Sequence, residues 1–239
     1  MPKIDEIAPG VYRISVTYKE IGLQFNHFLV RDDEPLLFHS GLNGMFGEVY
    51  EGVSKLIKPS DLRWVGFSHF ESDECGSLNR WLEAAPNAEA VCSSLGALVS
   101  VNDFAKRPAK GMNDGETLRT GDKVYRFCST AHLPHGWDAG VLYEETDKTL
   151  FCSDLFTHFG EVEPLTESDV VGRAADSLRN MQESPFAYYI PYTPQTKGIL
   201  SRLASLDTKT LAIMHGSCFT GDCGKALLDL SSVIEEVLG

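Results

Sequence analysis

A run of seven residues, Ser68 to Glu74, holds the side chains of this sequence that are best suited to chemistry. It places an imidazole and two carboxylates at alternate positions, as His69, Glu71 and Asp73. Imidazole and carboxylate groups are common ligands of metal ions in proteins. The apolar segment 64–67 directly before the run has the composition of a buried strand. The spacing therefore predicts a metal site at the end of a strand.

Three further candidate ligands also follow segments that have the pattern of strands. His135 lies in a loop between two predicted strands, Asp154 follows the run 150–153, and His215 follows the apolar run 211–214. Any one of them alone would be read as a surface or core residue. Strand ends that converge on one edge of a sheet can gather distant side chains into one cleft. Because the pattern repeats, we expect all of these residues to share one site.

The elements that must position these side chains alternate between strands and helices. We expect strands at 11–18, 28–31, 36–39, 64–67, 91–92, 118–128, 140–144, 149–152 and 211–214. We expect helices at 46–57, 76–85, 95–104, 169–184, 195–205 and 224–238. No internal repeat, low-complexity segment or linker interrupts the pattern. It predicts an α/β protein with a single domain over residues 1–239.

Composition and charge exclude several functions. The chain has 239 residues, a net charge of −13 and hydrophobic residues at 43%, which is typical of a globular protein with a core. The negative charge argues against nucleic acid and against an anionic membrane surface as partners. The first residues lack the pattern of a signal peptide, and no apolar stretch approaches the roughly 18 residues needed to span a bilayer. We therefore expect a cytoplasmic protein whose six cysteines are reduced.

The order of the candidate ligands resembles a known family. The run from His69 to Glu74, followed by His135, Asp154 and His215, is similar to the metallo-β-lactamase fold. More narrowly, it resembles the diiron domain of the flavodiiron proteins, which have His-x-Glu-x-Asp where the zinc hydrolases of this fold usually have His-x-His-x-Asp-His. From His69 the intervals are 66 residues to His135, 85 to Asp154 and 146 to His215, and they are similar to the spacing in the family. The resemblance implies a four-layer αββα sandwich.

The resemblance also implies a set of ligands for two iron ions. His69, Glu71 and His135 would hold one iron, Asp73 and His215 the second, and Asp154 would bridge the two. A bridging carboxylate offsets the repulsion between two metal ions that lie close together. Glu71 in place of an imidazole makes the site harder, which shifts its preference from zinc toward iron or manganese. Zinc and manganese remain the alternatives to iron.

Three residues depart from the family pattern. Glu74 stands where relatives usually have a histidine, so it either ligates a metal or points away from it. His132 precedes His135 by three residues and is either a pocket residue or the ligand in its place. We assign Glu74 and His132 as candidate catalytic residues. His39 stands where fold relatives commonly have an aspartate that orients a ligand, and a histidine there could serve the same purpose.

The function implied is the binding of O₂ or NO at a non-haem diiron site, with reduction as a further step. The sequence ends at Gly239 without a flavodoxin-like domain, so we expect a stand-alone protein, either an oxygen sensor with a signalling partner or an oxidoreductase with an external electron donor. We expect Phe25, Trp137 and Tyr192 to line the pocket. The alternative is a dinuclear zinc hydrolase, against which Glu71 counts. Flavodiiron relatives form homodimers, which leaves a homodimer open here.

Overall fold

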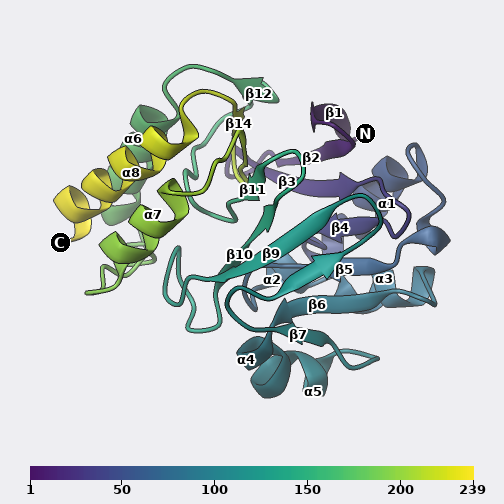
Figure 1. The fold of residues 1–239 in the computed structure, drawn as a ribbon. Coiled ribbons are helices and arrows are strands. Elements are labelled where there is room, and N and C mark those ends of the chain that lie inside the picture. The colour runs from purple at the N-terminus through teal and green to yellow at the C-terminus, as the bar shows by residue number, and fades with distance from the viewer.

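The first half of the chain builds one mixed sheet of seven strands. The computed structural model describes residues 1–239 (Figure 1). The strands lie in chain order, antiparallel from β1 to β4 and parallel from β4 to β7. They are β1 Lys3–Ala8, β2 Val11–Tyr18, β3 Leu23–Val30, β4 Leu36–Phe38, β5 Trp64–Gly66, β6 Glu89–Ser93 and β7 Lys110–Met112.

The second half builds another seven-stranded sheet, in the order β12-β14-β13-β11-β10-β9-β8. Its strands are β8 Thr117–Arg119, β9 Val124–Ser129, β10 Gly140–Glu144, β11 Thr149–Phe151, β12 Leu165–Thr166, β13 Thr210–Ala212 and β14 Cys218–Phe219. The strands β8 to β11 form an antiparallel meander, and β13 lies parallel to β11. The strands β11 and β13 therefore end at the same edge of this sheet.

Three apolar clusters hold the layers together. One lies between the sheets and contains Phe38 of β4 and Phe151 of β11, whose ring centroids are 5.2 Å apart. A second packs helices of the first half on the outer face of the first sheet, and a third packs α6, α7 and α8 on the second sheet. Figure 1 shows the resulting four layers, with the late helices (green to yellow) on the side away from the early ones. The predicted αββα sandwich is confirmed.

The helices begin and end where the sequence offers caps and breaks. They are α1 Phe46–Ser54, α2 Ser72–Cys75, α3 Leu78–Ala84, α4 Ser94–Gly96, α5 Asn102–Phe104, α6 Val170–Gln182, α7 Thr196–Ala204 and α8 Cys223–Leu238. The side chain of Asp169 accepts from the backbone of Gly172 at the start of α6, and Asp222 accepts from Lys225 at the start of α8. None of these helices is long and apolar enough to cross a membrane.

Two predicted elements are wrong in detail. The single strand expected over 118–128 is broken after Arg119, because Asp32 draws the backbone of Asp122 and Lys123 and the hydroxyl of Thr120 into a turn. The single helix expected over 95–104 is divided into α4, a π-helical stretch at Ala97–Val101, and α5. The strands β1, β7, β12 and β14 were not predicted from the sequence, and most of them are only two or three residues long.

Candidate metal centre

Six predicted ligands meet where strands of both sheets end. His69 and Glu71 follow β5, and Asp73 lies in the first turn of α2. His135 lies between β9 and β10, Asp154 follows β11, and His215 follows β13. Because these strands end at adjoining edges of the two sheets, residues up to 146 positions apart in the sequence come together. The structure thus brings the six side chains together, and their role as ligands stays a prediction.

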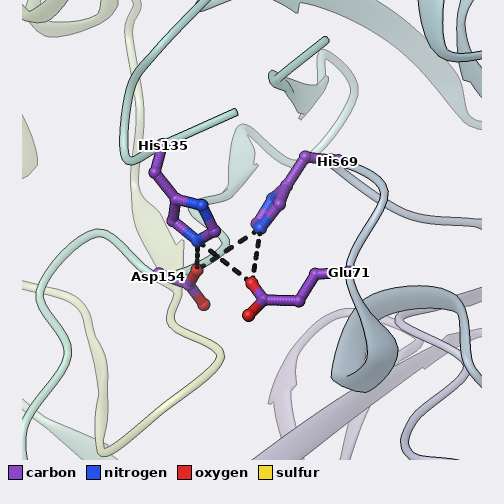
Figure 2. Close-up of side chains that lie close together, drawn as sticks. All are labelled: His69, Glu71, His135 and Asp154. Carbon is purple, nitrogen blue, oxygen red and sulfur yellow. Dashed lines mark hydrogen bonds and ion pairs between the residues drawn. The ribbon is translucent and has the colours of Figure 1, made fainter. Parts of the chain in front are cut away.

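The first group contains His69, Glu71, His135 and Asp154 (Figure 2). Glu71 Oε2 lies 3.0 Å from His69 Nε2 and 3.1 Å from His135 Nε2. Asp154 Oδ2 lies 3.0 Å from His135 Nε2 and 3.7 Å from His69 Nε2. Two ligands bound at about 2.1 Å to one metal are separated by about 3.0–3.4 Å. Three of these four distances fall in that range, the fourth is slightly longer, and all the atoms of the group lie within 4.8 Å of one another, which suits one metal ion.

The second group contains Asp73, Asp154 and His215. His215 Nε2 lies 3.3 Å from Asp73 Oδ2 and 3.2 Å from Asp154 Oδ1. Asp154 thus turns one carboxylate oxygen toward each group. This is the arrangement of a carboxylate that is shared between two metal ions.

The charges in this cluster fit a pair of cations. Burial lowers the pKa of His69, but its hydrogen bond to Glu71 and the nearby carboxylates raise that pKa to about 10. The same opposition between burial and carboxylates brings the pKa of His135 to about 9 and that of His215 to about 10. Without metal, protons on these imidazoles balance the carboxylates. Metal ions bound by neutral imidazoles would supply that positive charge instead.

Two buried oxygens also favour a cation. Asp73 Oδ1 and Asp154 Oδ1 are shielded from solvent and accept no well-aligned hydrogen bond. A buried carboxylate oxygen without a donor is unfavourable unless a cation satisfies it. Burial raises the pKa of Asp73, whereas the histidines around Asp154 hold its pKa well below the usual range. The donor set, the spacing and the unsatisfied oxygens agree on a dinuclear metal site.

A mostly apolar cavity of about 240 Å³ lies against the site and shares Glu71, Asp73, Asp154 and His215 with it. Phe25 lines the cavity as predicted, and its ring meets that of His215 edge-on with 4.8 Å between centroids. The other two predictions are wrong. Trp137 is 42% exposed, and Tyr192 points its hydroxyl toward Glu235; neither lines the cavity.

Tyr189 is the site residue that the sequence analysis missed. It lines the cavity, donates its hydroxyl proton to Glu71 Oε2 at 2.9 Å, and packs its ring 4.2 Å from that of His135. Tyr189 lies in the loop between α6 and α7, where Phe186, Tyr188 and Tyr189 form an aromatic cluster in the sequence. That cluster was the available signal, and it marks the loop without saying which ring faces the site.

Comparison with known proteins agrees with this geometry. The family model described as "ODP family beta lactamase" matches residues 23–216, which is most of the chain. This chain belongs to that family. The resemblance to the metallo-β-lactamase fold and to the diiron domain of flavodiiron proteins is thereby confirmed.

Two relatives and one solved structure illustrate the match of this ODP family member. It is 29% identical over 206 residues to the flavo-diiron protein FprA2 of Clostridium acetobutylicum, covering 84% of this chain and 50% of the relative. It is 27% identical over 210 residues to the rubredoxin-oxygen oxidoreductase of Megalodesulfovibrio gigas. That match covers 86% of this chain and 51% of the relative. The solved rubredoxin oxygen:oxidoreductase of Desulfovibrio gigas superposes with a TM-score of 0.81 at 22% identity. The superposition covers 96% of this chain and 61% of the solved chain. The chain spans about half the length of the curated relatives it matches.

Glu74, one of the two predicted catalytic residues of this ODP family member, lies beneath the site rather than in it. Its side chain is fully buried and belongs to neither ligand group. Its carboxylate accepts from Ser68 and Ser153, and burial raises its pKa. Of the two alternatives for Glu74, the geometry matches the one in which it points away from the metals.

His132, the other predicted catalytic residue, has an exposed side chain and belongs to neither ligand group. Its backbone N–H donates to the carbonyl of Gly136 at 2.7 Å, which closes the turn that carries His135. His135, and not His132, belongs to the first group. The catalytic roles of Glu74 and His132 stay predictions, and the placement of the two side chains gives them no support.

Proposed function

We propose that this chain holds two iron ions and uses them to bind and reduce O₂ or NO. His69, Glu71 and His135 would hold one iron, Asp73 and His215 would hold the other, and Asp154 would be shared between them. The observation that carries the proposal is that Asp154 directs one oxygen into each of two groups, and that within each group the ligand atoms lie within 4.8 Å of one another.

The ligand chemistry supports iron over zinc. The two groups together offer three imidazoles and three carboxylates, and zinc sites of comparable nuclearity are richer in nitrogen and sulfur ligands. Glu71 contributes a hard anionic oxygen, and its pKa is held at about 2 because hydrogen bonds from His135 and His69 outweigh the effect of burial. Glu71 is therefore ionised at neutral pH and available as a ligand.

The relatives support the same chemistry. Their names describe a flavo-diiron protein and an oxidoreductase that passes electrons between rubredoxin and oxygen. We propose that residues 1–239 form one domain of the diiron type. Reduction of O₂ to water requires four electrons, and two ferrous ions supply two. The remaining electrons must come from a redox group outside these residues, which makes an external redox protein a proposed partner.

The residues around the site suit a small apolar gas. The bound irons would supply the electrons for reduction and the Lewis acidity that binds the gas. Phe25, Leu23 and Ile190 give the cavity an apolar wall that disfavours water next to the irons. The hydroxyl of Tyr189, which lines the same cavity, donates to Glu71 and is a neutral proton donor beside the site. Burial and nearby carboxylates raise the pKa of Tyr189, so it keeps its proton.

The test is metal analysis of protein purified without air, followed by absorption spectra as O₂ or NO is admitted. We expect about two irons per chain and a new visible band that forms with the gas. A band that persists in O₂ without a donor favours binding and sensing, and a band that decays rapidly with an added electron donor favours reduction.

Zinc in both groups after growth with ample iron, with no spectral change in O₂ or NO, would overturn the proposal. That result would favour the alternative of a dinuclear metal hydrolase, in which the two metals activate a water molecule. Hydrolysis of ester, thioester and phosphodiester substrates by the zinc-loaded protein would then be the next measurement.

A further inference from the structure

A buried polar cluster lies beneath the first ligand group. It consists of Ser68, Glu74, Ser153 and His39, each with at most 1% of its surface exposed. None of the four belongs to a ligand group. Buried polar side chains are almost always hydrogen-bonded, so the donors and acceptors of this cluster can be counted.

Glu74 receives three donors. Ser68 Oγ and Ser153 Oγ lie 2.9 Å and 2.6 Å from Glu74 Oε1, and the backbone N–H of Ser68 donates to Oε2 at 2.9 Å. Ser68 Oγ also lies 2.6 Å from His69 Nδ1. Ser68 thus stands between the carboxylate of Glu74 and the imidazole of His69.

Proton counting fixes the role of His69. A serine hydroxyl has one proton, and Ser68 Oγ also lies 2.6 Å from Ser153 Oγ. The proton of Ser68 therefore goes to Glu74 Oε1 or to Ser153 Oγ, and in both cases none is left for His69. The oxygen of Ser68 can then only accept from His69, which places a proton on His69 Nδ1. The other ring nitrogen, Nε2, is the one that faces Glu71 and Asp154 in the first ligand group. A proton on Nδ1 leaves Nε2 as the nitrogen whose lone pair can bind a metal.

His39 completes the arrangement on the other oxygen. His39 Nδ1 lies 3.2 Å from the carbonyl oxygen of Asn26 and must donate to it, because a carbonyl only accepts. His39 Nε2 lies 3.4 Å from Glu74 Oε2. This contact is not a well-aligned hydrogen bond, and it involves Oε2, so Glu74 Oε1 remains the acceptor for the serine hydroxyls. The relay to His69 is therefore independent of this contact.

We infer that Glu74 is a positioning residue that acts through Ser68 to hold His69 in the tautomer that binds metal, without ligating the metal itself. The inference rests on the proposed metal pair and assigns roles within it. His215, in the second group, obtains the same result differently, because its Nδ1 donates directly to the backbone carbonyl of Gln24 at 2.9 Å.

The test compares Glu74→Gln and Ser68→Ala with the parent chain. The glutamine is nearly isosteric, but its amide has one acceptor and one donor side. The backbone N–H of Ser68 requires the acceptor, so the donor side faces the serines and opposes the relay. Ser68→Ala removes the middle hydroxyl and leaves Glu74 in place. In both variants we expect Co²⁺ affinity at the first group to fall by about 10- to 100-fold, the usual effect of removing such a partner.

The measurement is titration with Co²⁺ followed by absorption, with His135→Ala and His215→Ala used to assign each binding step to a group. The double variant should bind Co²⁺ about as tightly as the single variant with the larger loss, because both substitutions break the same relay. A second readout is the His69 Nδ1–H proton in the Zn²⁺-loaded protein. Its NMR resonance should lie far downfield in the parent chain and move upfield in Glu74→Gln.

Glu144→Gln is the matched control. Glu144 is equally buried and accepts from the backbone N–H groups of Thr146 and Asp147, but it lies at the far end of β10 from Ser68. We expect its Co²⁺ affinities to stay within twofold of the parent. If Glu74→Gln fails to fold, Ser68→Ala decides the question, since it keeps the carboxylate.

Three outcomes would overturn the inference. Parental Co²⁺ affinity at the first group in Ser68→Ala would show that no relay operates. A loss of Co²⁺ affinity in Glu74→Gln, together with parental Co²⁺ affinity in Ser68→Ala, would indicate that Glu74 ligates the metal directly. If the loss of Co²⁺ affinity in the double variant equalled the product of the two single losses, Glu74 and Ser68 would act independently. If the parent chain itself bound no pair of metal ions, the proposed function would fail first, and this result is distinct from the other three.

Discussion

The two ligand groups are held in place by different parts of the protein. In the first group, His69 is oriented by side chains, through Ser68 and Glu74, and Glu71 is oriented by the hydroxyl of Tyr189. In the second group, His215 is oriented by the backbone carbonyl of Gln24 in β3. Side-chain partners can be exchanged by single substitutions, whereas a carbonyl within a sheet is fixed by the fold. The first group is thus the adjustable half of the site.

The groups also differ in how many ligands they offer. The first has four, and the second has three, among them Asp154, which is common to both. Asp73 and His215 also border the apolar cavity, as does Phe25, which packs against His215. Fewer protein ligands leave more positions for a small molecule. Glu71 and Asp154 border the cavity as well. We propose that the first group, through Glu71, sets the metal preference and that the second group, with fewer protein ligands, leaves more room for the gas.

The strongest test of the comparison removes the residue that both groups share. Asp154→Ala should reduce the metal content from about two ions per chain to one or none, because it takes one oxygen from each group and leaves His135 and His215 without their partner. Metal analysis after dialysis measures this. Asp176→Ala on the exposed face of α6 is the control and should keep both ions. Two tightly held ions in Asp154→Ala would rule out the bridging role.

Glu71→His changes the first group alone and should change which metal is preferred. An imidazole in place of a carboxylate softens the group, so we expect the zinc-to-iron ratio to rise by about tenfold or more and the reaction with O₂ to be lost. Competitive loading with Fe²⁺ and Zn²⁺ measures the ratio. The control is Glu83→His, an exposed position on α3. A variant that binds iron and reacts with O₂ like the parent would show that Glu71 does not set the preference.

Protonation affects both groups in the metal-free protein. The pKa values of His69 and His215 are raised to about 10, and that of His135 to about 9, from an ordinary value of 6.5. A raised pKa in the folded state stabilises the fold fully below pH 6.5, and the stabilisation is lost as pH rises through the folded value. The midpoint temperature of thermal unfolding should therefore decrease as the pH is raised from 7 to 10.

The matching measurement uses the Zn²⁺-loaded protein over the same pH range. Metal binding displaces the protons from the imidazoles, so the fall in the unfolding midpoint between pH 7 and 10 should be much smaller. Equal slopes with and without metal would mean that other groups cause the pH dependence and that the histidines do not hold these protons.

The layers were predicted from the sequence through the family resemblance, and the candidate ligands were first marked by local patterns. His69, Glu71 and Asp73 form a motif directly after an apolar strand, and the strand ends at β11 and β13 place Asp154 and His215. The contacts of Glu74 could not be predicted, because Ser153 reaches it from 79 residues away. Tyr189 was missed for a similar reason, since its contact with Glu71 spans 118 residues of sequence.

The smallest expected effect sharpens the comparison at the first group. Tyr189→Phe removes one hydrogen bond to Glu71 and keeps the ring against His135. A hydrogen bond to a charged group contributes about 1.5–3 kcal/mol, but Glu71 is partly exposed to solvent, so we expect a loss of about 1 kcal/mol in unfolding free energy.

Both metals should remain bound in Tyr189→Phe, because Glu71 still receives hydrogen bonds or metal at the same oxygen. Urea unfolding and metal analysis measure the two effects, and Tyr188→Phe, at a ring that is 84% exposed, is the control. If the phenol also delivers a proton to the gas, the rate of O₂ or NO reduction should fall while metal content stays unchanged. Loss of one metal from Tyr189→Phe would instead show that the hydroxyl is needed to hold Glu71 in its ligand position.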